Sequence, residues 1–278
     1  MKKSILITGC SSGIGQYCAI QLHQRGYQVF ASARKQQDVE ALKAQGLEDT
    51  IQLDLNDSDS ITRAVNHVVK ATDGKLYALF NNGAYGQPGA VEDLSRDALR
   101  RQFETNFFGW AELTNQLLPY MRKQNQGRII QNSSVLGLVA MPFRGAYNAS
   151  KFALEGLTDT LRIELAGTKI QLSLIEPGPI TSQFRHNALA SLQQYIDIES
   201  SIHKEDYQTA IARLEKTVST TPFTLGPEAV YAKLLHALEA KKAKTRYYVT
   251  FPTYLLGYLR RVLPTSWLDR MLAKTGKM

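Results

Sequence analysis

Tyr147 and Lys151 stand four residues apart in a run, residues 145–166, whose pattern predicts a helix. Residues at that spacing share one helix face, so the phenol and the ammonium can converge on one spot. A free tyrosine, with a pKa of about 10, is a poor acid or base at neutral pH, and a nearby cation favours its phenolate. The pair predicts proton transfer to a carbonyl or from an alcohol. Taken alone, it also fits a helix with one aromatic residue and one surface lysine.

A glycine-rich turn near the N-terminus has the character of a nucleotide site. The β-rich residues 4–8 lead into Gly9-Cys10-Ser11-Ser12-Gly13-Ile14-Gly15, and apolar residues then recur at helical spacing up to Gly26. A turn from a strand into a helix presents backbone N–H groups and the helix N-terminus to a pyrophosphate. The spacing differs from the usual G-x-G-x-x-G fingerprint, and a plain glycine loop is the alternative.

The end of the second expected strand, residues 28–33, bears on the choice of dinucleotide. Enzymes that use NAD carry an acidic residue there for the ribose 2′-hydroxyl. This chain has Arg34 and Lys35 and no acid. Two cations suit a 2′-phosphate, because an arginine fork matches phosphate oxygens. The sequence therefore favours NADP(H), with a solvated basic turn as the alternative.

Strands and helices alternate along the chain, which predicts an α/β fold with one doubly wound parallel sheet flanked by helices. Polar residues follow several of these strands, at the sheet edge where ligands gather. They include Asp54 with Leu55, the run Asn81-Asn82-Gly83-Ala84, and Ser134. A helix is expected over residues 103–124. The other strands are expected at residues 51–53, 76–80, 128–132, 170–175 and 246–249.

The composition sets the class of protein. The 278 residues, 44% of them hydrophobic, suffice for one large core. The net charge of +8 fits anionic small molecules, a membrane surface or nucleic acid. Cys10 and Cys18 show no metal-ligand spacing and predict no metal site, and so few cysteines favour a reducing, cytoplasmic compartment. The sequence has no signal-peptide pattern and no run of the ~18 apolar residues that a spanning helix needs.

Taken together, these motifs resemble the classical short-chain dehydrogenases/reductases, which implies a single Rossmann-type oxidoreductase domain over residues 1–278. More narrowly, residues 133–137, 174–180 and 224–228 are similar to bacterial NADP-dependent aldehyde reductases and to hydroxysteroid and retinol dehydrogenases. The resemblance covers residues 4–182. It rests on the glycine turn, Asn81-Asn82-Gly83-Ala84, Asn106, Ser134, Tyr147 with Lys151, and Pro177-Gly178.

The resemblance assigns roles to individual residues. Tyr147 becomes the acid/base, Lys151 lowers its pKa and holds the nicotinamide ribose, Ser134 orients the carbonyl, and Asn106 holds a proton-relay water. Two positions depart from the family: Gly83-Ala84 inverts the usual order, and Ser182 replaces a threonine. The implied cofactor contacts are Gly9, Ser11, Ser12, Gly13, Ile14, Gly15, Arg34, Lys35, Asp54, Leu55, Asn81, Gly83, Tyr147, Lys151, Pro177, Gly178, Ile180 and Ser182.

Two segments lie outside these motifs. By family position, residues 183–223 are expected to form a substrate lid. Residues 251–278 form an amphipathic C-terminal extension, apolar on one side, basic on the other and broken at Pro264. This extension can cover the active site, bind a partner subunit, or lie on an anionic membrane. Packing against the protein's own core or a second subunit is favoured over lipid.

Three functions remain open at this point. The favoured one is NADPH-dependent reduction of aldehydes or ketones. The second is NAD(P)-dependent oxidation of a hydrophobic alcohol such as a retinoid or steroid, and the third is a non-catalytic dinucleotide sensor. The expected partners are a small carbonyl or alcohol substrate, no nucleic acid, and further copies of the chain in a homodimer or homotetramer.

Overall fold

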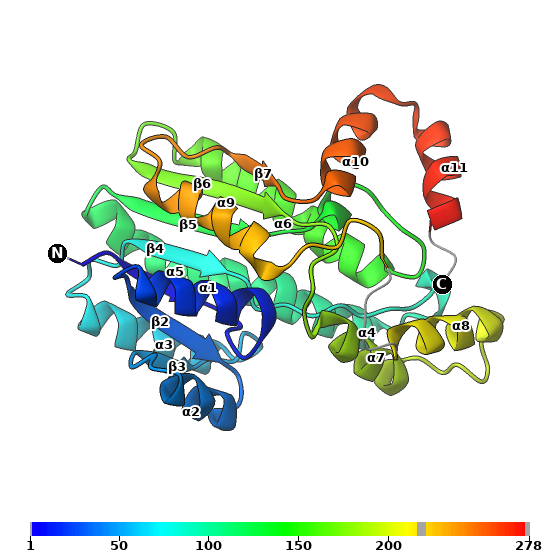
Figure 1. Ribbon diagram of the computed structural model, residues 1–278, viewed down its shortest axis with the longest axis horizontal. Helices are drawn as coiled ribbons and strands as arrows, with labels where there is room; N and C mark the ends of the chain where they lie inside the picture. The colour runs from blue at the N-terminus through cyan, green and yellow to red at the C-terminus, as the bar shows by residue number, and fades with distance from the viewer. Residues whose placement is uncertain (1, 216–220, 276–278) are drawn as a thin grey trace.

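The computed structural model describes residues 2–215 and 221–275, and its centre is one seven-stranded parallel sheet (Figure 1). The strand order is β3-β2-β1-β4-β5-β6-β7, and each neighbouring pair is parallel. This confirms the predicted doubly wound sheet, and the order reverses between β1 and β4. The strands are β1 (Ser4–Ile7), β2 (Gln28–Ala33), β3 (Thr50–Gln52), β4 (Ala78–Asn81), β5 (Gly127–Asn132), β6 (Ile170–Glu176) and β7 (Arg246–Tyr248).

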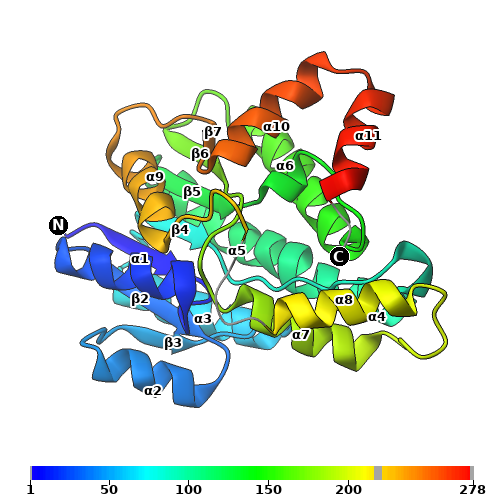
Figure 2. The ribbon, with the colours of Figure 1, turned by 45° about the vertical axis from the view of Figure 1, so that its right-hand side comes forward.

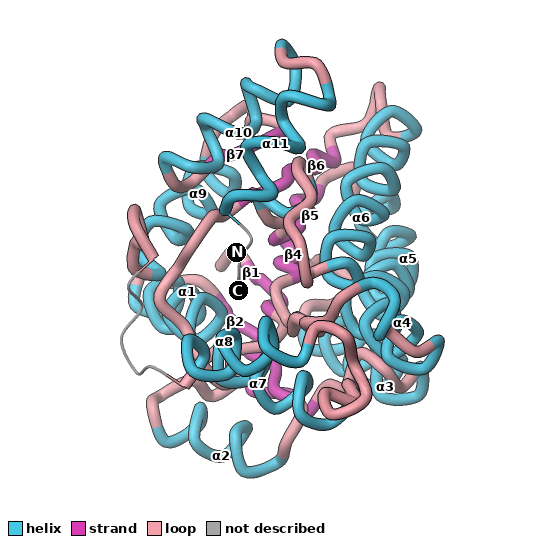
Figure 3. The backbone as a smooth tube through the Cα atoms, turned by 90° about the vertical axis from the view of Figure 1, so that its right-hand side faces the viewer, coloured by secondary structure: helices cyan, strands magenta, loops and turns pink. Residues whose placement is uncertain are grey.

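Helices cover both faces of the sheet, as the end-on view in Figure 3 shows. Alternation along β1 explains the two layers: Ile5 and Ile7 join the apolar cluster on one face, and Leu6 joins the cluster on the other. One face carries α1 (Gly13–Gln24), α2 (Gln36–Ala44) and α9 (Pro227–Glu239). The other carries α3 (Ser58–Ala71), α5 (Gly109–Lys123) and α6 (Gly145–Glu164).

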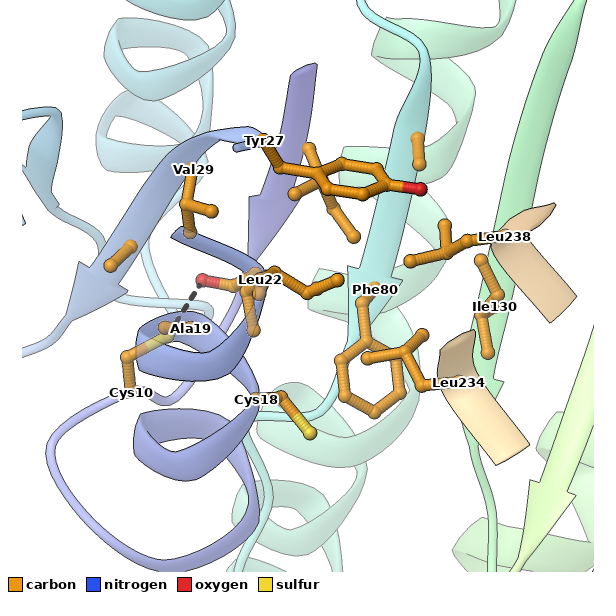
Figure 4. Close-up of a cluster of buried hydrophobic side chains, with 14 of the residues drawn as sticks. Cys10, Cys18, Ala19, Leu22, Tyr27, Val29, Phe80, Ile130, Leu234 and Leu238 are labelled. Atoms are coloured by element: carbon orange, nitrogen blue, oxygen red, sulfur yellow. Dashed lines mark hydrogen bonds between the residues drawn. The ribbon is translucent and has the colours of Figure 1, made fainter. Parts of the chain in front are cut away.

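Both cysteines lie inside the first of these layers, as Figure 4 shows. Cys18 projects from α1 toward Phe80, and the Cys10 thiol donates a hydrogen bond to the Ile7 carbonyl at 3.3 Å. Both are free and fully buried, and burial raises the pKa of the Cys10 thiol to about 12. A thiol with so high a pKa stays protonated at neutral pH and is a poor nucleophile. We therefore interpret both cysteines as packing residues.

The remaining helices lie at the carboxyl ends of the strands (Figures 1 and 2), with α7 and α8 on one side and α10 and α11 on another. Five residues of the expected lid, 216–220, fall outside the described residues. No helix in the described ranges is long and apolar enough to cross a membrane. These elements are α4 (Arg96–Phe103), α7 (Phe184–Tyr195), α8 (Lys204–Leu214), α10 (Phe251–Val262), α11 (Thr265–Thr275) and the short turns η1 (Val91–Asp93) and η3 (Val135–Gly137).

The stretch expected to be a helix, residues 103–124, is helical in the structure, but the helical run begins earlier and is not α-helical throughout. The chain is helical from Arg96, passes through one π-helical turn, η2 (Glu104–Phe108), and continues as α5. Two tertiary contacts account for the wide turn. A Cβ on Gly109 would lie 2.1 Å from the Leu55 carbonyl oxygen, and Asn106 is bonded to another loop. Single π-turns of this kind are frequent at functional sites.

Candidate active site

Tyr147 lies in the first turn of α6, at the carboxyl end of the sheet, and Lys151 follows one turn later. The Lys151 ammonium is 5.7 Å from the centroid of the Tyr147 ring and 4.3 Å from that of the Trp110 ring. It donates a hydrogen bond to the Asn132 carbonyl at 2.8 Å, and the side chain is only 1% exposed. The structure therefore brings the phenol and the ammonium together on one helix face.

Burial sets the protonation of this pair. It raises the pKa of the Tyr147 phenol to about 12, and hydrogen bonding to Ser134 opposes the rise. It lowers the pKa of Lys151 to about 7, against the attraction of the Glu155 carboxylate. Burial is thus the largest influence on the Tyr147 pKa, and a lowering of that pKa by the Lys151 charge stays a prediction. At neutral pH the phenol holds its proton and is ready to donate it.

Ser134 follows β5 and begins the short turn η3. Its Oγ accepts a hydrogen bond from the Leu136 N–H at 3.1 Å and also interacts with the Tyr147 phenol. The two hydroxyls thus come from different elements, a strand end and a helix, and meet at one point. Two converging hydroxyl donors can polarise a carbonyl oxygen and stabilise the negative charge that develops on it.

Asn106 is fully buried in the π-turn, and its side chain forms two hydrogen bonds with the backbone of Tyr85. Its Nδ2 donates to the Tyr85 carbonyl at 2.8 Å, and its Oδ1 accepts from the Tyr85 N–H at 3.2 Å. The side chain therefore fixes the loop after β4. Each of the two side-chain groups makes one hydrogen bond to Tyr85, and the role of Asn106 in holding a relay water stays a prediction.

The glycine turn has the tight geometry of a phosphate cradle. Gly9 and Gly13 adopt positive φ angles of 70° and 57°, which favour glycine. A Cβ on Gly9 would lie 2.4 Å from the Cα of Gly83, and one on Gly15 would lie 2.2 Å from the Gly9 carbonyl. The inverted Gly83-Ala84 order therefore fits, since the two glycine backbones pack against each other. Ser12 caps α1 without a side-chain bond, which leaves the helix N-terminus available to an anion.

A chain of hydrogen bonds joins this turn to Lys151. Thr8 Oγ1 accepts from the Asn82 and Gly83 N–H groups, each at 2.8 Å. The Asn82 amide donates to the Thr8 carbonyl at 3.0 Å and accepts from the Asn132 amide at 2.8 Å. The carbonyl of Asn132 then holds the Lys151 ammonium. The nucleotide turn and the ammonium thus share one rigid set of contacts.

A cleft of about 450 Å³ runs along the carboxyl ends of the strands, and the residues around it suit a nucleotide. Helix α7 lines it with a stripe at helical spacing, Asn187, Ser191 and Gln194. Sequence reasoning missed that stripe, because no motif marks residues 183–223. Predicted contacts that do line the cleft are Gly9, Ser11, Arg34, Lys35, Asp54, Leu55 and Gly83.

Comparison with known proteins agrees with this geometry. The profile of the short chain dehydrogenase family matches residues 3–193. This chain is a short-chain dehydrogenase. It is 42% identical to the uncharacterized oxidoreductase YbbO of Escherichia coli K12 over 98% of this chain and 94% of the relative. It is 34% identical to human 17-beta-hydroxysteroid dehydrogenase type 1 over 88% and 77%. A Burkholderia phymatum short chain dehydrogenase/reductase, solved with NAD, superposes with a TM-score of 0.77, 26% identity and coverage of 98% and 95%.

Other predicted contacts of this short-chain dehydrogenase lie beside the cleft. A Cβ on Gly13 would lie 3.0 Å from the Ser182 Cβ, so Ser182 sits against the glycine turn. Ile180 forms a bridge with Leu225 on the same side, and the Ile14 side chain packs on the core and leaves only its backbone for a ligand. Pro177 and Gly178 act in packing. The Pro177 carbonyl accepts from the Val135 N–H, and a Cβ on Gly178 would meet Thr250 Oγ1 at 2.1 Å.

Asn81 is another predicted cofactor contact that does not line the cleft. Its side chain is fully buried and donates to Thr114 Oγ1 at 3.0 Å. Its Oδ1 is buried and has no hydrogen-bond partner in the part of the chain that the structure describes, and the cofactor contact of Asn81 stays a prediction. Among the described residues, no cluster of His, Cys, Asp and Glu could hold a metal ion.

Behind Lys151, this short-chain dehydrogenase buries a charged cluster. Arg246 bridges Glu155, Glu176 (2.7 Å) and Asp159 (2.6 Å). Three carboxylates share one guanidinium, so burial and mutual repulsion raise the pKa of Glu176 to about 8. The sequence had indicated none of this, because the four residues come from α6, β6 and β7 and show no motif spacing.

Proposed function

We propose that this oxidoreductase reduces aldehyde or ketone carbonyls with NADPH, with Tyr147 as the general acid. The observation that carries the proposal is the protonated Tyr147 phenol beside Ser134. Burial keeps the phenol neutral. The phenol can pass its proton to the substrate oxygen when negative charge develops on that oxygen during reduction. When bound, the nicotinamide ring supplies the hydride that reduces the carbonyl carbon.

Each residue has a separate task. Ser134 and Tyr147 hold the carbonyl oxygen, and Tyr147 gives it a proton. Lys151, fixed by Asn132 and Trp110, places its ammonium beneath the phenol ring, where its charge steadies the phenolate left behind. Tyr147 packs against an apolar cluster that includes Leu136 and Val139, and its ring contacts the ring of Phe184.

Two exposed cations support NADPH over NADH. Arg34 and Lys35 line the cleft at the end of β2, and neither forms an ion pair with a carboxylate in residues 2–215 or 221–275. Both charges are therefore free for a 2′-phosphate. Family membership alone leaves this choice open, since the superposable Burkholderia protein was solved with NAD.

The two alternatives receive less support. Oxidation of a hydrophobic alcohol runs through the same residues in reverse, with Tyr147 taking up the proton, whereas the neutral phenol of the free protein is the form that reduction requires. A non-catalytic sensor would not require the four predicted catalytic residues to be brought together. Ser134, Tyr147 and Lys151 meet at one point, and Asn106 fixes the adjoining loop.

The test is turnover of NADPH and NADH with a panel of medium-chain and aromatic aldehydes. Tyr147→Phe should lower kcat by about 10²–10⁴-fold, because it removes the proton donor and keeps the ring. NADPH affinity should stay nearly unchanged. Tyr258→Phe, the same substitution on an exposed part of α10, is the matched control. A Tyr147→Phe enzyme with more than about a tenth of the wild-type kcat contradicts the acid role.

A further inference from the structure

Three arginines meet beside the active site without an acidic partner. Arg144 precedes α6, Arg185 lies in the first turn of α7, and Arg213 lies in the last turn of α8. Arg185 donates from Nη2 to the Arg213 carbonyl, and Arg144 donates from Nη1 to the Pro142 carbonyl at 3.3 Å. Throughout residues 2–215 and 221–275, no ion pair links any of the three to a carboxylate.

This arrangement is costly for the protein by itself. Within the described parts of the chain, the Nη1 of Arg185 and the Nε of Arg213 are buried and have no hydrogen-bond partner. Burial and the nearby charge of Arg213 lower the pKa of Arg144 to about 10, and burial with the charge of Arg185 lowers that of Arg213. Guanidinium groups that are held close, partly desolvated and unpaired raise the local free energy unless an anion joins them.

The cluster adjoins the catalytic tyrosine. Arg144 is three residues before Tyr147, at the entrance to the same helix. Phe184, the neighbour of Arg185, packs its ring against the Tyr147 ring with centroids 5.3 Å apart. None of the three arginines lines the nucleotide cleft, whose cations at the end of β2 are Arg34 and Lys35. The three arginines therefore lie near the phenol and outside the lining of the nucleotide cleft.

We propose that Arg144, Arg185 and Arg213 form a subsite for an anionic group of the substrate, a carboxylate or a phosphate on the molecule whose carbonyl is reduced. Planar guanidinium forks match the oxygens of both groups and can donate several hydrogen bonds at once. The apolar side chains around Tyr147 then contact the part of the substrate between the carbonyl and the anion. The inference rests on the proposed carbonyl reduction and names the substrate class that this site takes.

The first test compares ω-oxo carboxylic acids of graded chain length with their methyl esters as substrates. We expect the wild-type enzyme to favour one acid over its ester by about 10- to 150-fold in kcat/KM, the range of a charge-assisted hydrogen bond. Arg213→Gln should bring this ratio toward one, and Arg213→Lys should keep part of it. Arg122→Gln, on an exposed part of α5, should leave the ratio unchanged. Equal turnover of acid and ester by the wild type at every length overturns the proposal.

The second test needs no turnover. Sodium phosphate should raise the Tm of the wild-type protein relative to sodium chloride of equal ionic strength, and it should do so with or without saturating NADPH. Arg213→Gln should lose this increase and, without phosphate, melt no lower than the wild type, because it removes one of three repelling charges. The paired substitution Arg34→Gln with Lys35→Gln should keep the increase.

The outcomes separate the two proposals. An increase in Tm that depends on Arg213, found in a protein that reduces no carbonyl, supports the anion subsite and refutes the reduction. Carbonyl reduction combined with an increase that Arg213→Gln retains, or that NADPH abolishes, refutes the subsite and keeps the reduction. In the last case the phosphate effect belongs to the nucleotide cleft.

Discussion

Replacing Lys151 by methionine should change how the stability of the protein depends on pH. The side chain is 1% exposed, and burial lowers its pKa from 10.5 to about 7. The folded protein therefore releases this proton near pH 7, whereas the unfolded chain holds it to about pH 10.5. Between these values the unfolded state binds more protons, so the free energy of unfolding of the wild type rises with pH.

The size of the effect follows from the same two values. One proton of difference corresponds to a gain of up to about 1.4 kcal/mol per pH unit. From pH 7.5 to 9.5 the wild type should therefore gain about 2–3 kcal/mol over Lys151→Met. Methionine is about as long as lysine and carries no charge, so it should be the more stable protein near pH 7. Its advantage should shrink as the pH rises.

Urea unfolding of both proteins at pH 7.5, 8.5 and 9.5 measures the difference in the free energy of unfolding. Glu176 titrates in this window and is present in both proteins, so to first order it cancels. The raised pKa of Tyr147, about 12, lies above the window. A difference between the two proteins that stays flat across these pH values would show that Lys151 keeps its proton in the folded state, and the reasoning about its desolvation would fail.

Three other changes test the remaining parts of the site and surface. Arg34→Asp combined with Lys35→Ala should weaken NADPH by about 10- to 150-fold and improve NADH in a binding titration; an unchanged ratio of the two affinities contradicts the cofactor proposal. Gly15→Ala should abolish nucleotide binding or folding, because its Cβ meets a carbonyl at 2.2 Å, whereas Gly156→Ala, with open space around it, should not lower the Tm. Val262→Glu, on the exposed face of α10, should weaken a homodimer or homotetramer in sedimentation velocity; binding of the wild type to anionic liposomes that this substitution abolishes would instead place the face on a membrane.

The sheet could be predicted from the sequence because each strand is marked locally. The run Gln28–Ala33 has the predicted bounds, since its apolar residues are flanked by Gly26 and the charged pair after it. The π-turn before Gly109 could not be predicted, because it depends on contacts with Leu55 and Tyr85, which are distant in the sequence. The local sequence pattern predicts whether a segment is a helix or a strand. Contacts with distant parts of the chain decide where a helix departs from regular α-helical geometry.

The same distinction applies to the site. Spacing alone placed Lys151 beneath Tyr147, because four residues on a helix fix the geometry. It could not show that burial raises the tyrosine pKa, because the packing of η3, α7 and α11 around the phenol appears in no local motif. The cluster of Arg144, Arg185 and Arg213 was missed for a similar reason. Its members are 41 and 28 residues apart in the sequence and meet only when α7 and α8 fold over the end of the sheet.

The C-terminal extension shows how one segment can serve two purposes. Leu268 and Leu272 of α11 are buried against Val135 and Leu136, in the turn that begins with Ser134. That face packs within the protein's own core, in the apolar cluster against which Tyr147 also packs. The opposite face leaves Trp267 62% exposed, together with apolar side chains of α10, and no described residue covers it. We propose that a second subunit packs on these exposed apolar side chains, which would hold α11 in place over Ser134.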